Sequence, residues 1–436
     1  MKKLYCLFLG AVVFLCSLFN DALCQSSKPA NKDTSHFGIP VLPGVSGFGL
    51  DTKGGQGGKI IVVKNLNLNG EGSLTEAINY DGPRIIVFEV AGYIDLNKKS
   101  MKIKNPFITI AGQTAPSPGI TLVRGCLSIG THDVIIQHIK VRPGEAGEVK
   151  KGGWEVDGIG TIGASNVIID HCSTSWSTDE NLSASGPRFD GKTPDEWRQN
   201  TSHKITISNC IIAQGLSNST HSKGEHSKGS LIHDNATEIL VYGNLYADNV
   251  ERNPFFKGGV QGSVVNNFIY NPGKAAIHYA LVESEWVGHE WITGKMSVEG
   301  NYIEYGPNTS EKISAGKFNG PVELYWKDNT IVSKKPAKEI TGTQTLVSKR
   351  PVWPDGLVPF PSVEVKNRVL KNAGAFPWDR DEIDKKIIDG SRDGNGKIVD
   401  SEIEAGGYPV IKPSYRSFKP EEWDMITLQR KIVRNK

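Results

Sequence analysis

Residues 239–246 read Ile-Leu-Val-Tyr-Gly-Asn-Leu-Tyr, and the same form returns as Val-Val-Asn-Asn-Phe-Ile-Tyr at 264–270 and Met-Ser-Val-Glu-Gly-Asn-Tyr-Ile at 296–303. Each unit is a short apolar run, typical of a β-strand, with an Asn beside it. Such units recur at intervals of roughly 23 to 35 residues, a spacing typical of stacked repeats. Their asparagines are Asn209, Asn244, Asn267, Asn301 and Asn329. The sequence therefore predicts a solenoid.

Similar apolar runs occur earlier, at 85–90, 107–110, 134–139, 167–171 and 204–208, and long helical periodicity is nearly absent between them. In a solenoid, each coil of strands cannot bury its apolar face alone and becomes stable only when neighbouring coils extend the core. Stacked Asn side chains can hydrogen-bond along such a stack. We therefore expect an all-β fold, a right-handed single-stranded parallel β-helix with an irregular C-terminal extension.

A β-sandwich or a propeller is the rival architecture. Both are built from hairpins, and Asn-Gly pairs are the strongest short hairpin signal. The obvious pairs are at 69–70 and 319–320. This scarcity favours the solenoid.

Composition narrows the class of protein. The chain has 436 residues, 22% of them charged, and a formal net charge of +3. A disordered polyelectrolyte and a basic nucleic-acid binder are both disfavoured by these values. Glycine contributes 48 residues without a collagen period, which is typical of a turn-rich β architecture.

The N-terminus has the form of a targeting segment. Lys2 and Lys3 precede an apolar run, and small residues follow near Cys24, so we interpret residues 1–24 as a signal peptide. A lipid anchor on Cys24 is the alternative, although Leu23 stands where a small residue is expected. No later stretch reaches the roughly 18 apolar residues of a membrane helix. We expect a protein without a membrane span that is secreted, periplasmic or held at the cell surface.

The remaining chain divides into three parts. We expect residues 25–45 to lead into the fold, residues 46–340 to form the β-helix domain, and residues 341–436 to form a Pro-rich, charged extension that packs on the β-helix. Ser-Leu-Thr-Glu at 73–76 has the form of a capping box and predicts a short helix over the open end of the stack. Cys126, Cys172 and Cys210, the cysteines after the signal peptide, are expected in the core.

Ordered motifs then make the sequence specific. They are Gly-Phe-Gly at 47–49, Gly-Gly-Gln-Gly-Gly-Lys at 54–59, Gly-Ser-Leu-Thr-Glu-Ala-Ile at 72–78, Ile-Thr-Ile-Ala-Gly-Gln-Thr-Ala-Pro-Ser-Pro-Gly-Ile at 108–120 and Ile-Asp-His-Cys-Ser at 169–173. Together they resemble the pectate lyases of polysaccharide lyase family 1, in their secreted bacterial form. The resemblance implies a calcium-dependent enzyme that cleaves (1→4)-α-D-galacturonan by β-elimination to unsaturated oligogalacturonides. We expect it to act on this acidic polysaccharide as a monomer.

Four acidic residues are candidate calcium ligands. Glu155 and Asp157 are two residues apart, so on an extended segment both point the same way and can converge on a cation. Asp179 and Glu180 follow a strand and a turn, and a bent backbone would let both reach the ion. Taken alone, these acids are more typical of a solvated face. The resemblance implies that Asp157 and Asp179 are ligands, with Glu155 and Glu180 as further candidates.

Three basic residues are candidates for catalysis and substrate binding. Residues 251–257, Glu-Arg-Asn-Pro-Phe-Phe-Lys, resemble the family's Arg-x-Pro-x-x-Arg motif with Lys257 in place of the second Arg. The resemblance makes Arg252 the catalytic base, and it gives Lys257 and Lys228 carboxylate-binding roles. Pro254 restricts the backbone beside Arg252. His221, His226 and His233 do not have a zinc spacing and are expected to be polar groups of the surface or groove.

The chemistry accounts for this mixture of charges. Removing H5 of galacturonate leaves negative charge on the sugar, which Ca²⁺ and cationic side chains stabilise. Guanidinium is a poor base at neutral pH, so positive neighbours must lower its pKa, and an alkaline optimum is expected. Two alternatives stay open from the residues alone. They are a β-helix glycoside hydrolase with paired carboxylates and a non-catalytic β-helix glycan-binding protein.

Overall fold

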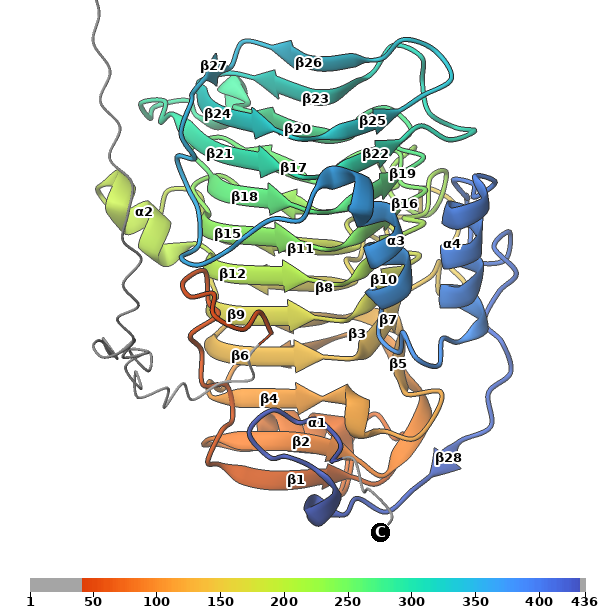
Figure 1. Cartoon of the computed structure of the whole chain (residues 1–436). Helices are drawn as coiled ribbons and strands as arrows, with labels where there is room; N and C mark the ends of the chain where they lie inside the picture. The colour runs from red at the N-terminus through yellow and green to blue at the C-terminus, as the bar shows by residue number, and fades with distance from the viewer. Residues whose placement is uncertain (1–40, 432–436) are drawn as a thin grey trace, which may run out of the picture. The chain divides into compact units, whose positions relative to one another are not determined.

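The strands of the protein stack as the coils of a parallel β-helix (Figure 1). The structure is a computed structural model that describes residues 41–431, all of which lie in one compact unit, residues 37–436. The proposed signal peptide and most of the segment 25–45 lie outside the described residues. Among the described strands every named pairing is parallel, apart from one antiparallel pair between β28 and β3.

One face of the coils is an 11-stranded sheet within the described residues. In sheet order, its strands are β1 Lys59–Val63, β2 Arg84–Phe88, β4 Ile108–Ala111, β6 His132–Gln137, β9 Ser165–Asp170, β12 His203–Ser208, β15 Thr237–Tyr242, β18 Gln261–Val265, β21 Gly294–Glu299, β24 Val322–Lys327 and β27 Thr345–Leu346.

The other faces are formed by a connected 17-stranded sheet of the described residues. Its strands are β3 Val90–Ile103, β5 Ile120–Ile129, β7 Ile139–Arg142, β8 Ile159–Ile162, β10 Ser173–Ser175, β11 Leu182–Ser185, β13 Ile211–Ala213, β14 Leu231–Ile232, β16 Leu245–Ala247, β17 Phe255–Lys257, β19 Phe268–Tyr270, β20 Ile277–Ala280, β22 Tyr302–Glu304, β23 Ser314–Asn319, β25 Thr330–Val332, β26 Lys338–Gly342 and β28 Ser414–Tyr415.

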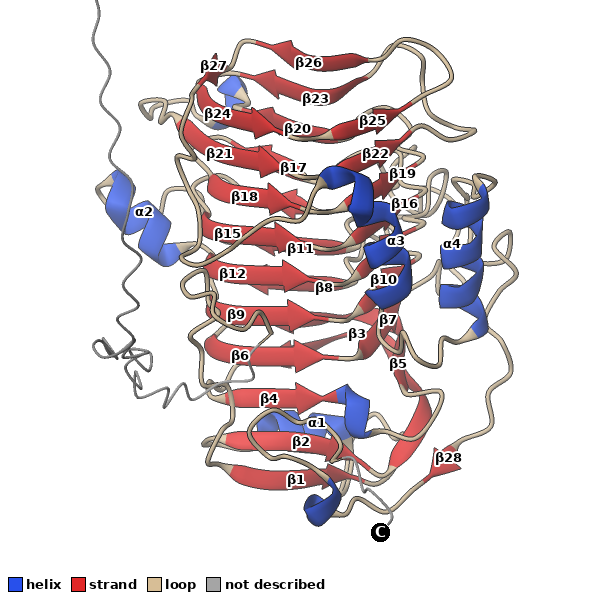
Figure 2. Cartoon of the chain, viewed as in Figure 1, coloured by secondary structure: helices blue, strands red, loops and turns tan. Residues whose placement is uncertain are grey.

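Short helices lie outside the sheets, as Figure 2 shows in blue. They are α1 Leu74–Asn79, α2 Pro194–Asn200, α3 Ser362–Asn372 and α4 Glu382–Asp393, with 3-10 turns η1 Gly112–Thr114, η2 Glu283–Glu285 and η3 Pro420–Glu422. The expected helix after Ser73 is confirmed: the Ser73 hydroxyl accepts from Glu76 N at 3.2 Å. Leu74, Ala77 and Ile78 of α1 join the main core beside β1 and β2.

The core follows from equal register in successive coils. Ile207 pairs with Val241, which pairs with Val264 and then Val298, so one aliphatic column runs through the stack. Alternate side chains of the same strands point outward and are also buried, under segments from both ends of the chain. Strands buried on both faces read as continuous apolar runs, which is why these segments do not alternate with polar residues.

The predicted ladder of asparagine side chains is present, with one correction. The amides of Asn244, Asn267, Asn301 and Asn329 are joined by hydrogen bonds of 2.9–3.0 Å between neighbours. Asn209 was wrongly assigned to this ladder. Because Ser208 pairs with Tyr242, the position level with Asn244 is Cys210, and Cys210 N donates to Asn244 Oδ1 at 2.8 Å.

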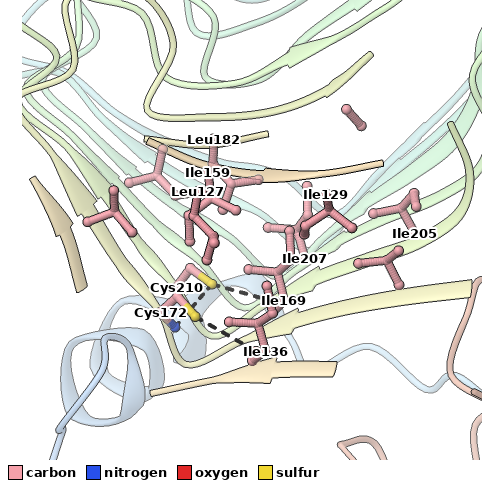
Figure 3. Packing of buried hydrophobic residues seen from close by; sticks show 14 of the residues in the cluster. Leu127, Ile129, Ile136, Ile159, Ile169, Cys172, Leu182, Ile205, Ile207 and Cys210 are labelled. Atoms are coloured by element: carbon pink, nitrogen blue, oxygen red, sulfur yellow. Dashed lines mark hydrogen bonds between the residues drawn. The ribbon is translucent and has the colours of Figure 1, made fainter. Parts of the chain in front are cut away.

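Cysteines therefore continue the ladder where asparagine stops. Cys172 and Cys210 are fully buried among aliphatic side chains, and Cys172 N donates to Cys210 Sγ at 3.4 Å (Figure 3). The core prediction is confirmed for these two residues, and Cys126 is partly exposed. All three are free thiols.

Strands continue to Leu346, six residues past the boundary expected from the sequence. Beyond it, α4 is held against the β-helix by buried ion pairs. Arg142 Nη1 lies 2.8 Å from Asp381 Oδ2 and Arg142 Nη2 lies 2.7 Å from Asp384 Oδ1. Within residues 41–431 there is no helix with the length and apolar character needed to cross a membrane.

Candidate active site

Three of the predicted acidic residues meet at one corner of the coils. Asp157 lies two residues before β8, whereas Asp179 and Glu180 lie in the turn between β10 and β11. Since β8 pairs with β11, the two segments are neighbours. One carboxylate oxygen from each of Asp157, Asp179 and Glu180 lies within 4.8 Å of the others.

Asp157 is the most perturbed of the three. Its Oδ2 accepts from Ser183 Oγ at 2.7 Å and its Oδ1 from Glu180 N at 3.2 Å. Burial, and then the nearby Asp179 carboxylate, raise the pKa of Asp157 to about 7. Two carboxylates in such proximity are unfavourable when both are ionised, unless a cation lies between them. Because all donors here are oxygens, the set suits a hard cation such as Ca²⁺.

Asp179 is shared with a histidine pair. Its Oδ1 lies 2.8 Å from His226 Nε2 and its Oδ2 lies 3.8 Å from His221 Nε2. Burial acts to raise the pKa of Asp179, but the hydrogen bond and charge of His226 hold it below the usual value. The imidazole rings of His221 and His226 are stacked with centroids 3.6 Å apart. His221 and His226 therefore lie beside the acidic group as polar residues, in line with the expectation that they belong to the surface or groove.

Glu155 is not brought into this carboxylate group. Its carboxylate binds the backbone N–H and the hydroxyl of Ser222, and its Oε1 lies 3.5 Å from His221 Nδ1. The hydrogen bonds from Ser222 lower its pKa. The alternation argument failed here because residues 155–157 are not in a strand. A ligand role for Glu155 stays a prediction.

The predicted cations stack beside the acids, each next to a carboxylate. Glu180, Lys228 and Glu251 are bridged in order across adjacent coils by parallel backbone pairing. Lys228 Nζ forms an ion pair with Glu251, and Arg252 forms one with Glu180. Glu251 was not singled out from the sequence, although it directly precedes Arg252 in the same motif.

Arg252 is held in an uncommon backbone conformation. Its φ is +64°, and its carbonyl accepts from Ser230 N at 2.6 Å. A left-handed non-glycine residue is maintained by its surroundings and is often found at functional sites. The side chain is 21% exposed, and burial lowers the pKa of its guanidinium, against the opposing effect of Asp179 and Asp157. Arg252 is thus partly open and close to both aspartates.

Lys257 lies in the same coil as Arg252, at the end of β17. Its Nζ is 3.4 Å from Asp234 Oδ2 and is paired with Glu285. Arg188 reaches the same acids, with Nε 3.0 Å from Asp234 Oδ2 and Nη2 3.1 Å from Glu285 Oε2. Sequence reasoning missed Arg188, Asp234 and Glu285 because they come from three separate loops and carry no local motif.

The arrangement therefore combines a carboxylate group suited to a hard cation, a partly buried guanidinium and two lysines in one row. Such a row can bind an anionic polymer whose charges repeat along its length. It can also stabilise negative charge that develops beside the guanidinium.

Known proteins resemble the chain in sequence and in fold. A protein named "Probable pectate lyase C" from Aspergillus flavus is 32% identical over 381 residues, covering 85% of this chain and 81% of the relative. The structure of the cedar pollen allergen Jun a 1 matches with a TM-score of 0.55 at 17% identity, over 75% of this chain and 92% of the allergen.

A pectate lyase structure described for its substrate specificity and anti β-elimination mechanism matches with a TM-score of 0.52 at 16% identity, over 78% of this chain and 99% of that one. At such identities the structural matches establish the fold. No protein-family model matches the chain. The Aspergillus relative is fungal, so the secreted bacterial form stays a prediction.

Proposed function

The chain belongs to the pectate lyases, and on this premise we propose that it cleaves (1→4)-α-D-galacturonan by calcium-dependent β-elimination, as a member of polysaccharide lyase family 1. The products would be unsaturated oligogalacturonides. The observation that carries this proposal is the position of the Arg252 guanidinium beside the Asp157, Asp179 and Glu180 carboxylates.

The acidic group fits calcium by its donor chemistry. Asp157 and Asp179 would hold the ion, with Glu180 as a third ligand and Glu155 as a more distant candidate. Bound there, Ca²⁺ would draw negative charge from the substrate carboxylate and so acidify the hydrogen at C5. The pKa of about 7 at Asp157 supports this assignment, because a cation would relieve the repulsion that raises it.

Arg252 is proposed as the base that takes the proton from C5. The electron pair left on C5 forms the C4–C5 double bond as the bond between C4 and its glycosidic oxygen breaks, and the departing oxygen takes a proton from solvent. The lowered pKa of Arg252, caused by burial, favours this role, and an alkaline optimum is expected because the guanidinium must be neutral to accept a proton. With Glu180 serving as a metal ligand instead of pairing with Arg252, the guanidinium would be free to approach the substrate.

Lys228 and Lys257 are proposed to bind uronate carboxylates on either side of Arg252. Each already pairs with a protein carboxylate, Glu251 or Glu285. These protein carboxylates neutralise both lysines in the free protein. Substrate binding would therefore exchange one carboxylate partner of each lysine for another. Lysine at 257 provides the charge without the two-pronged grip of arginine.

The other assignments from the sequence become part of the same proposal. Residues 1–24 would direct export to the periplasm, the cell surface or the medium, and residues 46–340 would form the catalytic β-helix. Residues 341–436 would brace it through contacts such as Arg142 with Asp381. The enzyme would act as a monomer on the polysaccharide.

The test is incubation of the purified protein with polygalacturonate or highly methylated pectin, each with Ca²⁺ or with chelator. We expect ultraviolet absorbance from the unsaturated product on polygalacturonate with Ca²⁺, and none with chelator. Arg252→Ala should lose at least about a thousandfold in rate, in the range for loss of a general base. Arg124→Ala, which removes an exposed guanidinium on another part of the β-helix, should leave the rate unchanged.

New reducing ends without ultraviolet absorbance would show that the protein hydrolyses the polysaccharide and would refute lysis. Full activity of Arg252→Ala would remove that residue from the mechanism.

A further inference from the structure

A cavity of about 630 Å³ lies away from the candidate active site. It is bounded by His138 and His171, which follow β6 and β9, and by residues of the C-terminal segment. None of the proposed catalytic, metal or substrate-binding residues lines it. The volume is within the roughly 300–1,000 Å³ of small-ligand sites. We call it the C-terminal cavity.

An imidazole pair forms one wall of the C-terminal cavity. His171 Nδ1 lies 2.8 Å from Asp170 Oδ2, and the ring of His171 is stacked on that of His138 at 5.1 Å. Asp170 also accepts from Gln137 Nε2 at 3.0 Å and from Ser208 Oγ at 2.8 Å. Burial acts to lower the pKa of His171, but the Asp170 carboxylate holds it above its usual value.

An exposed aromatic ring lies beside the imidazole pair. The Trp378 ring lies 5.1 Å from His138 and 5.0 Å from Phe376, yet Trp378 is 61% exposed. An indole that is anchored on one face and open on the other is the usual partner of a sugar ring or another flat, amphipathic ligand.

Two guanidinium groups complete the cavity. Arg416 Nη2 donates to the carbonyls of Thr114 at 2.9 Å and Ala115 at 3.2 Å, which fixes the side chain. Arg430 Nη2 donates to Glu422 Oε2 at 2.6 Å. The two groups are close enough for Arg430 to contribute to lowering the pKa of Arg416, after burial. Like charges brought together are stabilised by an anion between them.

The lining also holds an unused acceptor. Gln113 Nε2 donates to Gln137 Oε1 at 3.1 Å, but the buried Oε1 of Gln113 has no hydrogen-bond partner among the described residues. Buried acceptors are normally paired, so a donor such as a hydroxyl group is expected there. The carboxylates that line the cavity are Asp170, which is engaged by His171, and the exposed Asp379.

We propose that the C-terminal cavity is a second, non-catalytic binding site for a uronate-bearing saccharide. The ring would stack on Trp378, its carboxylate would bind Arg416 and Arg430, and a hydroxyl would donate to Gln113. The choice of a uronate over another cyclic anion rests on the proposed function. A second contact on the same polymer raises the effective concentration of substrate at the active site.

The test is titration of the full chain carrying Arg252→Ala, in chelator, with trigalacturonate by calorimetry. Chelator removes calcium-dependent binding at the active site, and the part of the remaining binding that is lost on substitution of a cavity residue reports the C-terminal cavity. A second substitution, Trp378→Ala or Arg416→Ala, should weaken this binding at least about tenfold, which corresponds to about 1.4 kcal/mol. Trp378→Phe should retain most of it, and Arg124→Ala should retain all of it.

The absence of binding in chelator would overturn the proposal, as would unchanged affinity in both Trp378→Ala and Arg416→Ala. Inorganic phosphate that binds as tightly as trigalacturonate would refute the saccharide part of it. Both residues are exposed, and far-ultraviolet circular dichroism checks that the variants are folded. A parallel assay of the parent chain on polygalacturonate keeps the two proposals separate. Absence of unsaturated product there would refute the proposed function, while the titration would still report the cavity.

Discussion

Replacing Asp157 by Asn is expected to stabilise the metal-free chain at neutral and alkaline pH and to abolish its stabilisation by Ca²⁺. The carboxylate is part-buried next to Asp179, so its ionised form is unfavourable without a cation. Asparagine has the same shape and can still accept from Glu180 N, as Asp157 Oδ1 does at 3.2 Å. The variant therefore removes the charge and keeps the local packing.

The size of the effect follows from the pKa. Asp157 has a pKa of about 7 in the folded chain against an ordinary value of 3.8. This difference of about three corresponds to about 4 kcal/mol, and solvent near the part-exposed side chain reduces it to about 2–4 kcal/mol. A raised acid pKa means that the folded chain binds the proton more tightly. The free-energy cost of ionising Asp157 in the folded chain is therefore absent below about pH 4, grows as pH rises and is complete above about pH 7.

Thermal unfolding measures both parts of the prediction. At pH 8 in chelator, Asp157→Asn should unfold about 2–5 °C above the parent, because a domain of this size loses about 0.8 kcal/mol of stability per degree near its midpoint. At pH 4 the two should agree. Ca²⁺ at a hundred times its dissociation constant should stabilise only the parent, by about 2.7 kcal/mol. Asp195→Asn, at an 88% exposed carboxylate, is the control and should match the parent throughout.

A variant that is no more stable than the parent at pH 8 would refute the electrostatic reasoning. Equal stabilisation of both chains by Ca²⁺ would refute the role of Asp157 as a ligand.

Three further substitutions test other parts of the molecule. In urea unfolding, Asn267→Ala should cost about 3 kcal/mol of unfolding free energy, because it leaves buried groups of the ladder unpaired. Asn329→Ala, at the part-buried end of the ladder, should cost about 1 kcal/mol. Equal costs would contradict the ladder argument. Asp381→Asn should cost about 3 kcal/mol at pH 7 by leaving Arg142 short of a partner. The pKa of Asp381 is lowered, despite burial, by Arg142, so this difference should narrow as pH falls below about 4, and a constant difference would contradict it. Lys257→Ala should raise the KM for polygalacturonate about tenfold with little change in kcat, and a loss confined to kcat would argue against a binding role.

Much of the fold could be predicted because the signal is periodic. A solenoid repeats one local solution in every coil, so the Asn spacing and the apolar runs already contain its architecture. The error at Asn209 shows the limit of this argument. Its position beside a strand looks like that of Asn244, but the pairing of Ser208 with Tyr242 moves Asn209 out of the ladder by one residue. There its amide donates to Asp170 Oδ1 at 2.9 Å instead.

The candidate site was predictable where its residues share a motif. Arg252 and Lys257 were found together because one proline-containing stretch carries both, and Asp179 and Glu180 are adjacent. The ion pairs of the site were not predictable. The carboxylate next to Lys228, for example, is that of Glu251, which comes from the following coil.

By itself the sequence determined the strand repeats, the stacked asparagines and the types of side chain available for chemistry, since these depend on residues near one another along the chain. The tertiary structure alone decided that Glu155 faces His221 and that distant loops bring Asp234 and Glu285 to Lys257. It also decided that the C-terminal segment encloses a cavity with His171. These contacts depend on the path of whole coils and on a register in which a shift of one residue reverses the direction of a side chain.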